Sequence, residues 1–172
     1  MQKKKLIVNL SEASIDKAIN ELKIYKSEFL KKVDLLRKRI ADYIAKESQA
    51  GFSSAILNDE INGTGTTPNV NVTVDDKDNV TVVIANGEDA VWVEFGAGVY
   101  HNTSVGGSLH PRGEELGFTI GSYGQGKGHQ KIWGYYDNGL HLTHGTPASM
   151  PMEKSFLSAM DKISEIINEV FG

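Results

Sequence analysis

The chain has 172 residues, 40% hydrophobic and 23% charged, with a formal net charge of -4, which is typical of one globular domain. It has no cysteine, which excludes disulfides and thiolate metal ligands. No apolar run approaches the length of a membrane span, and the start Met-Gln-Lys-Lys-Lys is unlike a signal peptide, so we expect a protein made and kept in a cytoplasm.

The charge is unevenly distributed. Residues 1–46 contain twelve of the eighteen Lys and Arg residues but only six Asp and Glu residues, a balance of +6, so residues 47–172 carry -10. A chain that is basic at one end and acidic at the other can attract copies of itself head to tail. A long solvated helix that is rich in lysine is an equally good interpretation.

The first predicted elements are a short strand at residues 6–10, where polarity alternates, and a long helix capped by Ser11 or Ser14. Apolar residues then recur every three or four positions, which predicts a helix of about nine turns with one apolar stripe, ending near Gly51. This helix is too long for a small domain to cover, so part of it can serve a neighbouring subunit. No heptad charge code supports a free coiled coil.

A β-hairpin is predicted next, after a loop at residues 58–68. Residues 70–74 alternate valine with polar residues, residues 80–85 form the partner strand, and residues 75–79 make the turn. The acids of this turn do not fit a calcium loop, because an EF-hand that starts at Asp75 needs a glycine at its sixth position, where Val80 stands.

The run Val-Trp-Val-Glu-Phe-Gly-Ala-Gly-Val-Tyr at residues 91–100 holds a lone carboxylate, Glu94. Asp89 as a cap and Gly96 as a terminator favour a short helix over a strand. A carboxylate among buried apolar residues needs a partner. We expect Glu94 to accept hydrogen bonds from amides of the glycine turn that follows, or to pair with a base such as Arg112; a catalytic carboxylate in an apolar pocket is the alternative.

Residues 96–145 differ in kind from the rest, because they hold thirteen of the eighteen glycines and all five histidines. Strands are possible at residues 117–123 and 132–136. A loop this long is functional or is ordered by a partner, so we expect it to order against neighbouring copies or another partner. Large aromatic side chains are expected to carry partner contacts: Trp92, Tyr100, Tyr123, Trp133, Tyr135 and Tyr136.

The chain ends in a second amphipathic helix, with Ser149 or Met150 as its cap and Pro151 in its first turn. We expect the two helical stripes to cover one antiparallel sheet. The stripes run through Ile19, Leu22, Phe29 and Val33, and through Phe156, Met160, Ile163 and Ile167.

Catalytic patterns are weak. Residues 121–128 match a phosphate loop up to Lys127, but Gly128 replaces the magnesium-binding hydroxyl and no helix follows. The chain has no HExxH zinc motif and no Gly-x-Ser-x-Gly nucleophile elbow. The acidic residues around the aromatic side chains argue against stacking on nucleic-acid bases. We expect no cofactor, no metal site and no catalytic residue. The histidines that could bind zinc, with Glu94 or Asp137, are His101, His110, His129, His141 and His144.

Several motifs occur in an order that resembles the neck and tail-completion proteins, or head–tail connectors, of tailed bacteriophages. They are Val-Glu-Phe-Gly-Ala-Gly, Gly-Ser-Tyr-Gly-Gln-Gly, Trp-Gly-Tyr-Tyr and Thr-His-Gly-Thr-Pro-Ala-Ser-Met-Pro-Met before the final helix, with the long first helix ending in Ala-Gly-Phe. The resemblance covers most of the chain. Family members often have Arg-Pro where this chain has Met150-Pro151. The motif residues taken as a structural signature are Glu94, Phe95, Gly96 and Gly98.

The resemblance implies one α+β domain over residues 1–172, a small antiparallel sheet packed by the two helices with a long glycine-rich insertion at about 96–145. It implies a non-enzymatic virion protein, assembled in the host cytoplasm, that forms a sixfold or twelvefold ring with DNA passing through it. Its partners would be portal-side neck proteins and the tail tube or tail terminator, with no membrane and no sequence-specific nucleic acid. The alternative is a metal-dependent phage enzyme using residues 101–144.

Overall fold

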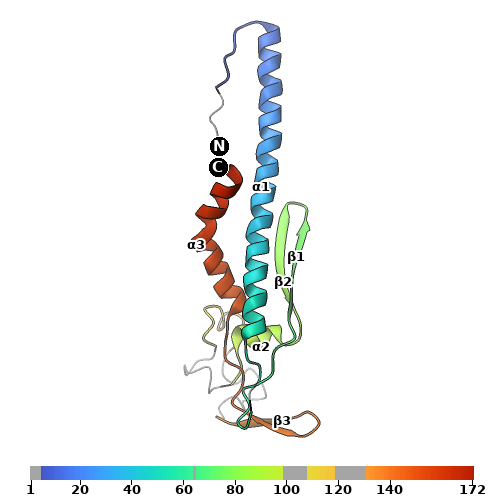
Figure 1. The fold of residues 1–172 in the computed structure, drawn as a ribbon, viewed down its shortest axis with the longest axis vertical. Coiled ribbons are helices and arrows are strands. Elements are labelled where there is room, and N and C mark those ends of the chain that lie inside the picture. The colour runs from blue at the N-terminus through green and yellow to red at the C-terminus, as the bar shows by residue number, and fades with distance from the viewer. Residues whose placement is uncertain (1–4, 64, 99–107, 119–130) are drawn as a thin grey trace.

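The computed structural model describes residues 5–63, 65–98, 108–118 and 131–172 (Figure 1). The fold class is confirmed: two long helices and a small antiparallel sheet pack together in an α+β arrangement. The predicted insertion at 96–145 falls in part outside the described residues. The elements in order are α1 (Glu12–Ser54), β1 (Asn71–Lys77), β2 (Val80–Asn86), α2 (Ala90–Phe95), β3 (Trp133–Tyr136), β4 (Leu140–Thr143) and α3 (Pro151–Phe171).

Helix α1 begins where the sequence predicts. The Ser11 side chain accepts a hydrogen bond from the Ser14 amide at 3.3 Å, and the helix runs three residues past Gly51. The strand predicted at residues 6–10 is wrong, because residues 5–10 form none. The Asn9 amide donates to the Ser14 hydroxyl, and the Asn9 side chain accepts from the Ser11 amide. The polar groups of this segment therefore support the helix cap and not the hydrogen bonds of a β-sheet.

Helix α3 lies antiparallel along the C-terminal half of α1 (Figure 1). At one end the two backbones approach closely, since a Cβ on Gly51 would lie 2.7 Å from the Pro151 Cβ. At the other end the Phe29 and Phe171 rings lie 5.9 Å apart. The buried face of α3 is narrow and holds Ser155, Ala159, Ile166 and Val170.

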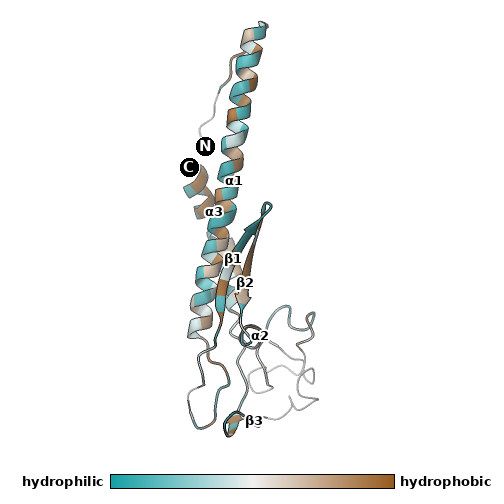
Figure 2. Cartoon of the chain, turned by 90° about the vertical axis from the view of Figure 1, so that its right-hand side faces the viewer, coloured by the Kyte–Doolittle hydropathy of each residue, from teal (hydrophilic) through white to brown (hydrophobic). Residues whose placement is uncertain are grey.

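Strands β1 and β2 form a hairpin on the side of α1 opposite α3 (Figures 1 and 2). Asp78 and Asn79 both have positive φ (48° and 67°), which suits a two-residue turn and lets the strands extend further than the sequence predicts. The Gln49 side chain holds the hairpin to α1: it donates to the Val70 carbonyl at 3.0 Å and accepts from the Val72 amide at 2.8 Å.

The core gathers where the C-terminal end of α1 meets α2 and the start of β1. Its buried members are Phe52, Leu57, Val70, Ala90 and Val93. The prediction that both helical stripes are buried against one sheet is wrong for the single chain. Seven of the eight stripe residues are exposed and Ile163 is half-buried, because α3 packs on α1 through a narrower face and α1 extends beyond every other element.

A charged contact fixes the tip of the hairpin to α1. Asp76 lies 2.9 Å from the Arg37 guanidinium and 3.0 Å from the Lys38 ammonium. The hydrogen bond from the Thr81 hydroxyl, followed by that from Lys38, lowers the pKa of Asp76 below its ordinary value of 3.8. This group therefore stabilises the docked hairpin above its unfolded-state pKa, and the contribution is lost as the pH falls through the lower folded-state pKa.

We expect Asp76→Asn to speed amide hydrogen exchange across β1 and β2 severalfold at neutral pH, with little change in α3, because the contact is local and exposed. Asp161→Asn, at an exposed position on α3, is the control. The protection of the wild-type hairpin, measured relative to the intrinsic exchange rate at each pH, should also fall as the pH falls below about 4, a step that the variant lacks. Equal exchange in wild type and variant at neutral pH would contradict this account.

Candidate functional site

Helix α2 places Glu94 at the start of α3. The Glu94 side chain is buried, its Oε2 accepts from the Met152 amide at 2.9 Å, and its Oε1 accepts from the Glu153 amide at 3.0 Å. Met150, the residue before α3, has a left-handed backbone (φ 52°) and makes no side-chain cap. Glu94 therefore supplies the cap that the local sequence lacks, and its negative charge is favourable at a helix N-terminus.

His110 is the third partner of this carboxylate. Its Nε2 lies 3.2 Å from Glu94 Oε1, and its Nδ1 accepts a hydrogen bond from the Arg112 amide at 3.0 Å. Because Nδ1 is an acceptor, Nε2 carries the proton and donates a hydrogen bond to the carboxylate. The His110 and Phe118 rings both pack against Phe95, with centroids 4.4 and 4.0 Å away.

We call Glu94, His110 and the amides of Met152 and Glu153 the Glu94 clamp. It joins α2, the segment 108–118 and α3, and both carboxylate oxygens and both imidazole nitrogens already have partners. The clamp therefore holds three segments of the chain together.

The partners expected for Glu94 are corrected by this geometry. Backbone amides do bind the carboxylate, but they belong to α3 and not to the glycine turn. The Gly96 amide donates to the Trp92 carbonyl at 2.8 Å and the Ala97 amide to the Thr146 carbonyl at 2.8 Å, so neither is available. The Arg112 side chain instead pairs with Glu115 at 3.2 Å, which raises the pKa of Arg112.

The rest of the structural signature surrounds the clamp. Phe95 is half-buried, and its carbonyl accepts a hydrogen bond from the Ser108 hydroxyl. Gly96 ends α2 with φ 74°. Gly98 has φ 88°, and a Cβ there would lie 2.9 Å from the His144 carbonyl oxygen, so a side chain would be both strained and crowded.

Of the aromatic residues predicted to bind partners, the four that the structure describes do not share one exposed surface. Trp92 is half-buried against the core, and Trp133 is half-buried in β3. The Tyr135 hydroxyl donates to Glu60 at 3.2 Å, and burial, followed by this contact, raises the pKa of Tyr135. Tyr136 alone of these described residues is largely exposed, at 82%. Tyr100 and Tyr123 lie outside the described residues.

The histidines that the structure describes are dispersed. His110 belongs to the Glu94 clamp, His141 lies 3.3 Å from Glu60, and His144 lies 3.6 Å from Asp59. Within the described ranges, no group of three or more His, Asp or Glu side chains is arranged to hold a metal ion. His101, His129 and the phosphate-loop pattern at 121–128 lie outside those ranges.

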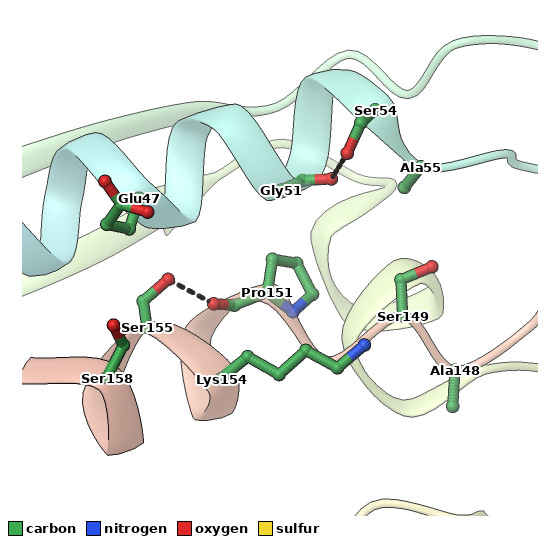
Figure 3. A pocket seen from close by; sticks show the side chains of 10 residues that line it. All are labelled: Glu47, Gly51, Ser54, Ala55, Ala148, Ser149, Pro151, Lys154, Ser155 and Ser158. Carbon is green, nitrogen blue, oxygen red and sulfur yellow. Dashed lines mark hydrogen bonds between the residues drawn. The ribbon is translucent and has the colours of Figure 1, made fainter. Parts of the chain in front are cut away.

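A groove of about 560 Å³ lies between the C-terminal end of α1 and the start of α3 (Figure 3). Its walls are mostly small residues and serines. The Ser54 hydroxyl donates to the Gly51 carbonyl and the Ser155 hydroxyl to the Pro151 carbonyl, so these groups serve the helix backbones. The groove follows from the close approach of the two helices and gathers no catalytic set.

Two apolar surfaces are exposed, one on α3 and one on the hairpin. The α3 stripe consists of Phe156, Met160, Ile163 and Ile167, and the hairpin face consists of Val80, Val82 and Ile84 on the outer side of β2. β2 has apolar residues on both faces, which is the sequence signal of a strand covered on both sides. The pattern of the sequence did not predict this face.

No family model, curated protein or solved structure matches the chain. None of the described helices has an apolar stretch long enough to cross a bilayer.

Proposed function

We propose that this chain is a non-enzymatic subunit of the neck or tail of a tailed phage, where it forms a ring with copies of itself and joins or completes the head–tail interface. The observation that carries the proposal is that α3 and the hairpin lie on opposite sides of α1 (Figures 1 and 2) and that each of them has exposed apolar side chains. A cyclic ring needs two different surfaces on each subunit, one for each neighbour.

Apolar contact supports this proposal better than charge does. Three bases of α1 are paired within the chain: Arg39 with Glu169 at 2.7 Å, and Arg37 and Lys38 with Asp76. An interface between the α3 stripe of one copy and the hairpin face of the next buries valine, isoleucine, methionine and phenylalanine side chains. Its strength should therefore change little as ionic strength rises.

The phage setting rests on the order of the sequence motifs. Under this proposal the partners are portal-side neck proteins and the tail tube or tail terminator, and DNA passes through the ring. The Glu94 clamp would keep α3, and with it the α3 stripe, at a fixed angle to α1. Ring closure requires that fixed angle, because a small rotational error at each interface accumulates around the ring.

The proposal is tested by placing a charge on each surface in turn. We expect Met160→Glu and Val82→Glu each to remove the ring species from sedimentation-velocity profiles, because an unpaired buried carboxylate is costly at an apolar contact. Both variants should keep the wild-type melting temperature, since both side chains are exposed. Asn168→Glu, which adds the same charge to an exposed position on α3, is the control. A ring that survives both charged variants would overturn the proposed interface.

A further inference from the structure

Helix α1 has an apolar seam that α3 covers over only part of its length. Near the end of α3, the Phe29 ring lies 5.9 Å from Phe171, and further along the Tyr43 hydroxyl lies 2.8 Å from that of Ser158. Beyond Phe29 the helix continues toward its N-terminus for roughly four to five turns while α3 stops (Figure 1). We call residues 12–29 of α1 the upper segment.

The same seam continues through the upper segment. Ile15, Ile19, Leu22, Lys26 and Phe29 follow one another at alternating intervals of four and three residues, which are the a and d positions of a heptad repeat. Ile15, Ile19 and Leu22 are 42%, 43% and 54% exposed. A helix this short has little stability of its own in water, and a second helix on the seam would stabilise it.

Charge along the upper segment distinguishes the possible partners. Glu12 and Asp16 lie at its N-terminal end, and Lys23 and Lys26 follow about two to three turns after Asp16. The other charged residues of the segment occupy heptad positions away from the seam: Lys17, Glu21 and Glu28. An antiparallel pairing with the same segment of a second copy brings the acidic end of each helix beside the basic residues of the other. A parallel pairing places like charges side by side.

We propose that the upper segment pairs with that of a second copy in an antiparallel helix pair around a two-fold axis. Ile19 of each copy packs against Leu22 of the other, and Ile15 packs against the aliphatic stem of Lys26. Asp16 of each copy then lies beside Lys23 of the second copy, and the Lys26 ammonium is within reach of Glu12.

The end of α3 selects this register. In this register the helix of the second copy begins beside Phe29, where α3 ends. The second helix therefore continues along the seam in the direction of α3. Sliding the helices by one heptad toward greater overlap would place the second helix over the Phe29–Phe171 contact. The pair does not rest on the proposed ring, and it leaves the α3 stripe and the hairpin face of both copies uncovered.

Disulfide trapping tests the pairing and its direction, because the chain contains no cysteine of its own. Asp16→Cys and Lys23→Cys chains are reduced, mixed and oxidised, alongside each variant alone. We expect a linked species of twice the 18.8 kDa chain mass in the mixture and little in either variant alone. Linkage within Asp16→Cys alone would show parallel pairing and overturn the proposal, as would no linkage in any sample.

Sedimentation separates this pair from the ring. In a Val82→Glu background, in which the proposed ring contact is blocked, we expect a pair of chains at micromolar concentration. Adding Leu22→Glu should leave single chains with helical circular dichroism retained for the rest of the fold. Adding Ile24→Glu, an equally exposed position on the opposite face of α1, should leave the pair intact. A single-chain mass in the Val82→Glu background alone contradicts the pair whether or not the ring exists, and a pair that survives Leu22→Glu contradicts the seam.

Discussion

Phe52→Ala should lower the free energy of unfolding by about 3–5 kcal/mol. Phe52 is 1% exposed and lies in the buried cluster with Leu57, Val70, Ala90 and Val93. Removing its ring leaves a cavity among side chains from α1, β1 and α2 that are anchored separately and cannot easily close around it. Chemical denaturation followed by circular dichroism measures the loss.

Phe156→Ala is the matched control, because it makes the same chemical change at a site that is half exposed. We expect it to cost less than about 1 kcal/mol in the single chain, since little apolar surface there leaves water on folding. A large cost would be expected if the stripe through Phe156 covered the sheet, as the sequence predicts. Equal losses for the two variants would show that the core does not lie where α1, β1 and α2 meet.

The second large effect is expected at the Glu94 clamp. Glu94→Gln keeps the size of the side chain but replaces one carboxylate oxygen with an NH₂ group. That group would face one of the three donors that bind Glu94: the Met152 amide, the Glu153 amide or the His110 Nε2–H. One buried donor then loses its acceptor, and the loss of a charged hydrogen bond costs on the order of 1–3 kcal/mol. The melting temperature should fall, and hydrogen exchange should rise first in the opening turn of α3.

Glu88→Gln is the control for this change, since Glu88 is exposed just before α2. Local exchange distinguishes a clamp from a general loss of stability. If the first turn of α3 exchanged no faster in Glu94→Gln than in wild type, the carboxylate would not be the cap of that helix.

The elements were largely predictable because their signals are local. Ser11 and the long apolar stripe specified α1, and Gly96 specified the end of α2. Asp89 stands at the start of α2 as predicted, yet its carboxylate accepts from the Asn69 amide at 2.8 Å in place of capping the helix. A cap residue in the sequence indicates where a helix starts, but a competing donor from another segment can take its side chain.

The partners of Glu94 could not be predicted, because they depend on how the chain folds back. The Met152 and Glu153 amides lie 58 and 59 residues further along the chain and reach Glu94 only after α3 packs on α1. The alternation of residues 6–10 was misleading for a related reason: a strand requires a partner edge, and the helix cap uses the donors of this segment.

The periodicity of a helix predicts which face is apolar, but it does not predict what covers that face. Periodicity identified Ile19 and Phe156 as members of apolar stripes, but their exposure depends on the lengths of α1 and α3 and on the narrow face that joins them. The hairpin face was missed because apolar residues on both sides of β2 are equally consistent with a strand buried within one chain.

The central claim, a ring subunit of the phage neck or tail, is tested most directly by electron microscopy of isolated tails of the encoding phage, prepared without this protein and then incubated with it. We expect a closed ring of uniform copy number at one end of each tail with the wild-type chain, and bare tail ends with Met160→Glu. Tails that stay bare with the wild-type chain, or rings that form equally well with Met160→Glu, would contradict the account.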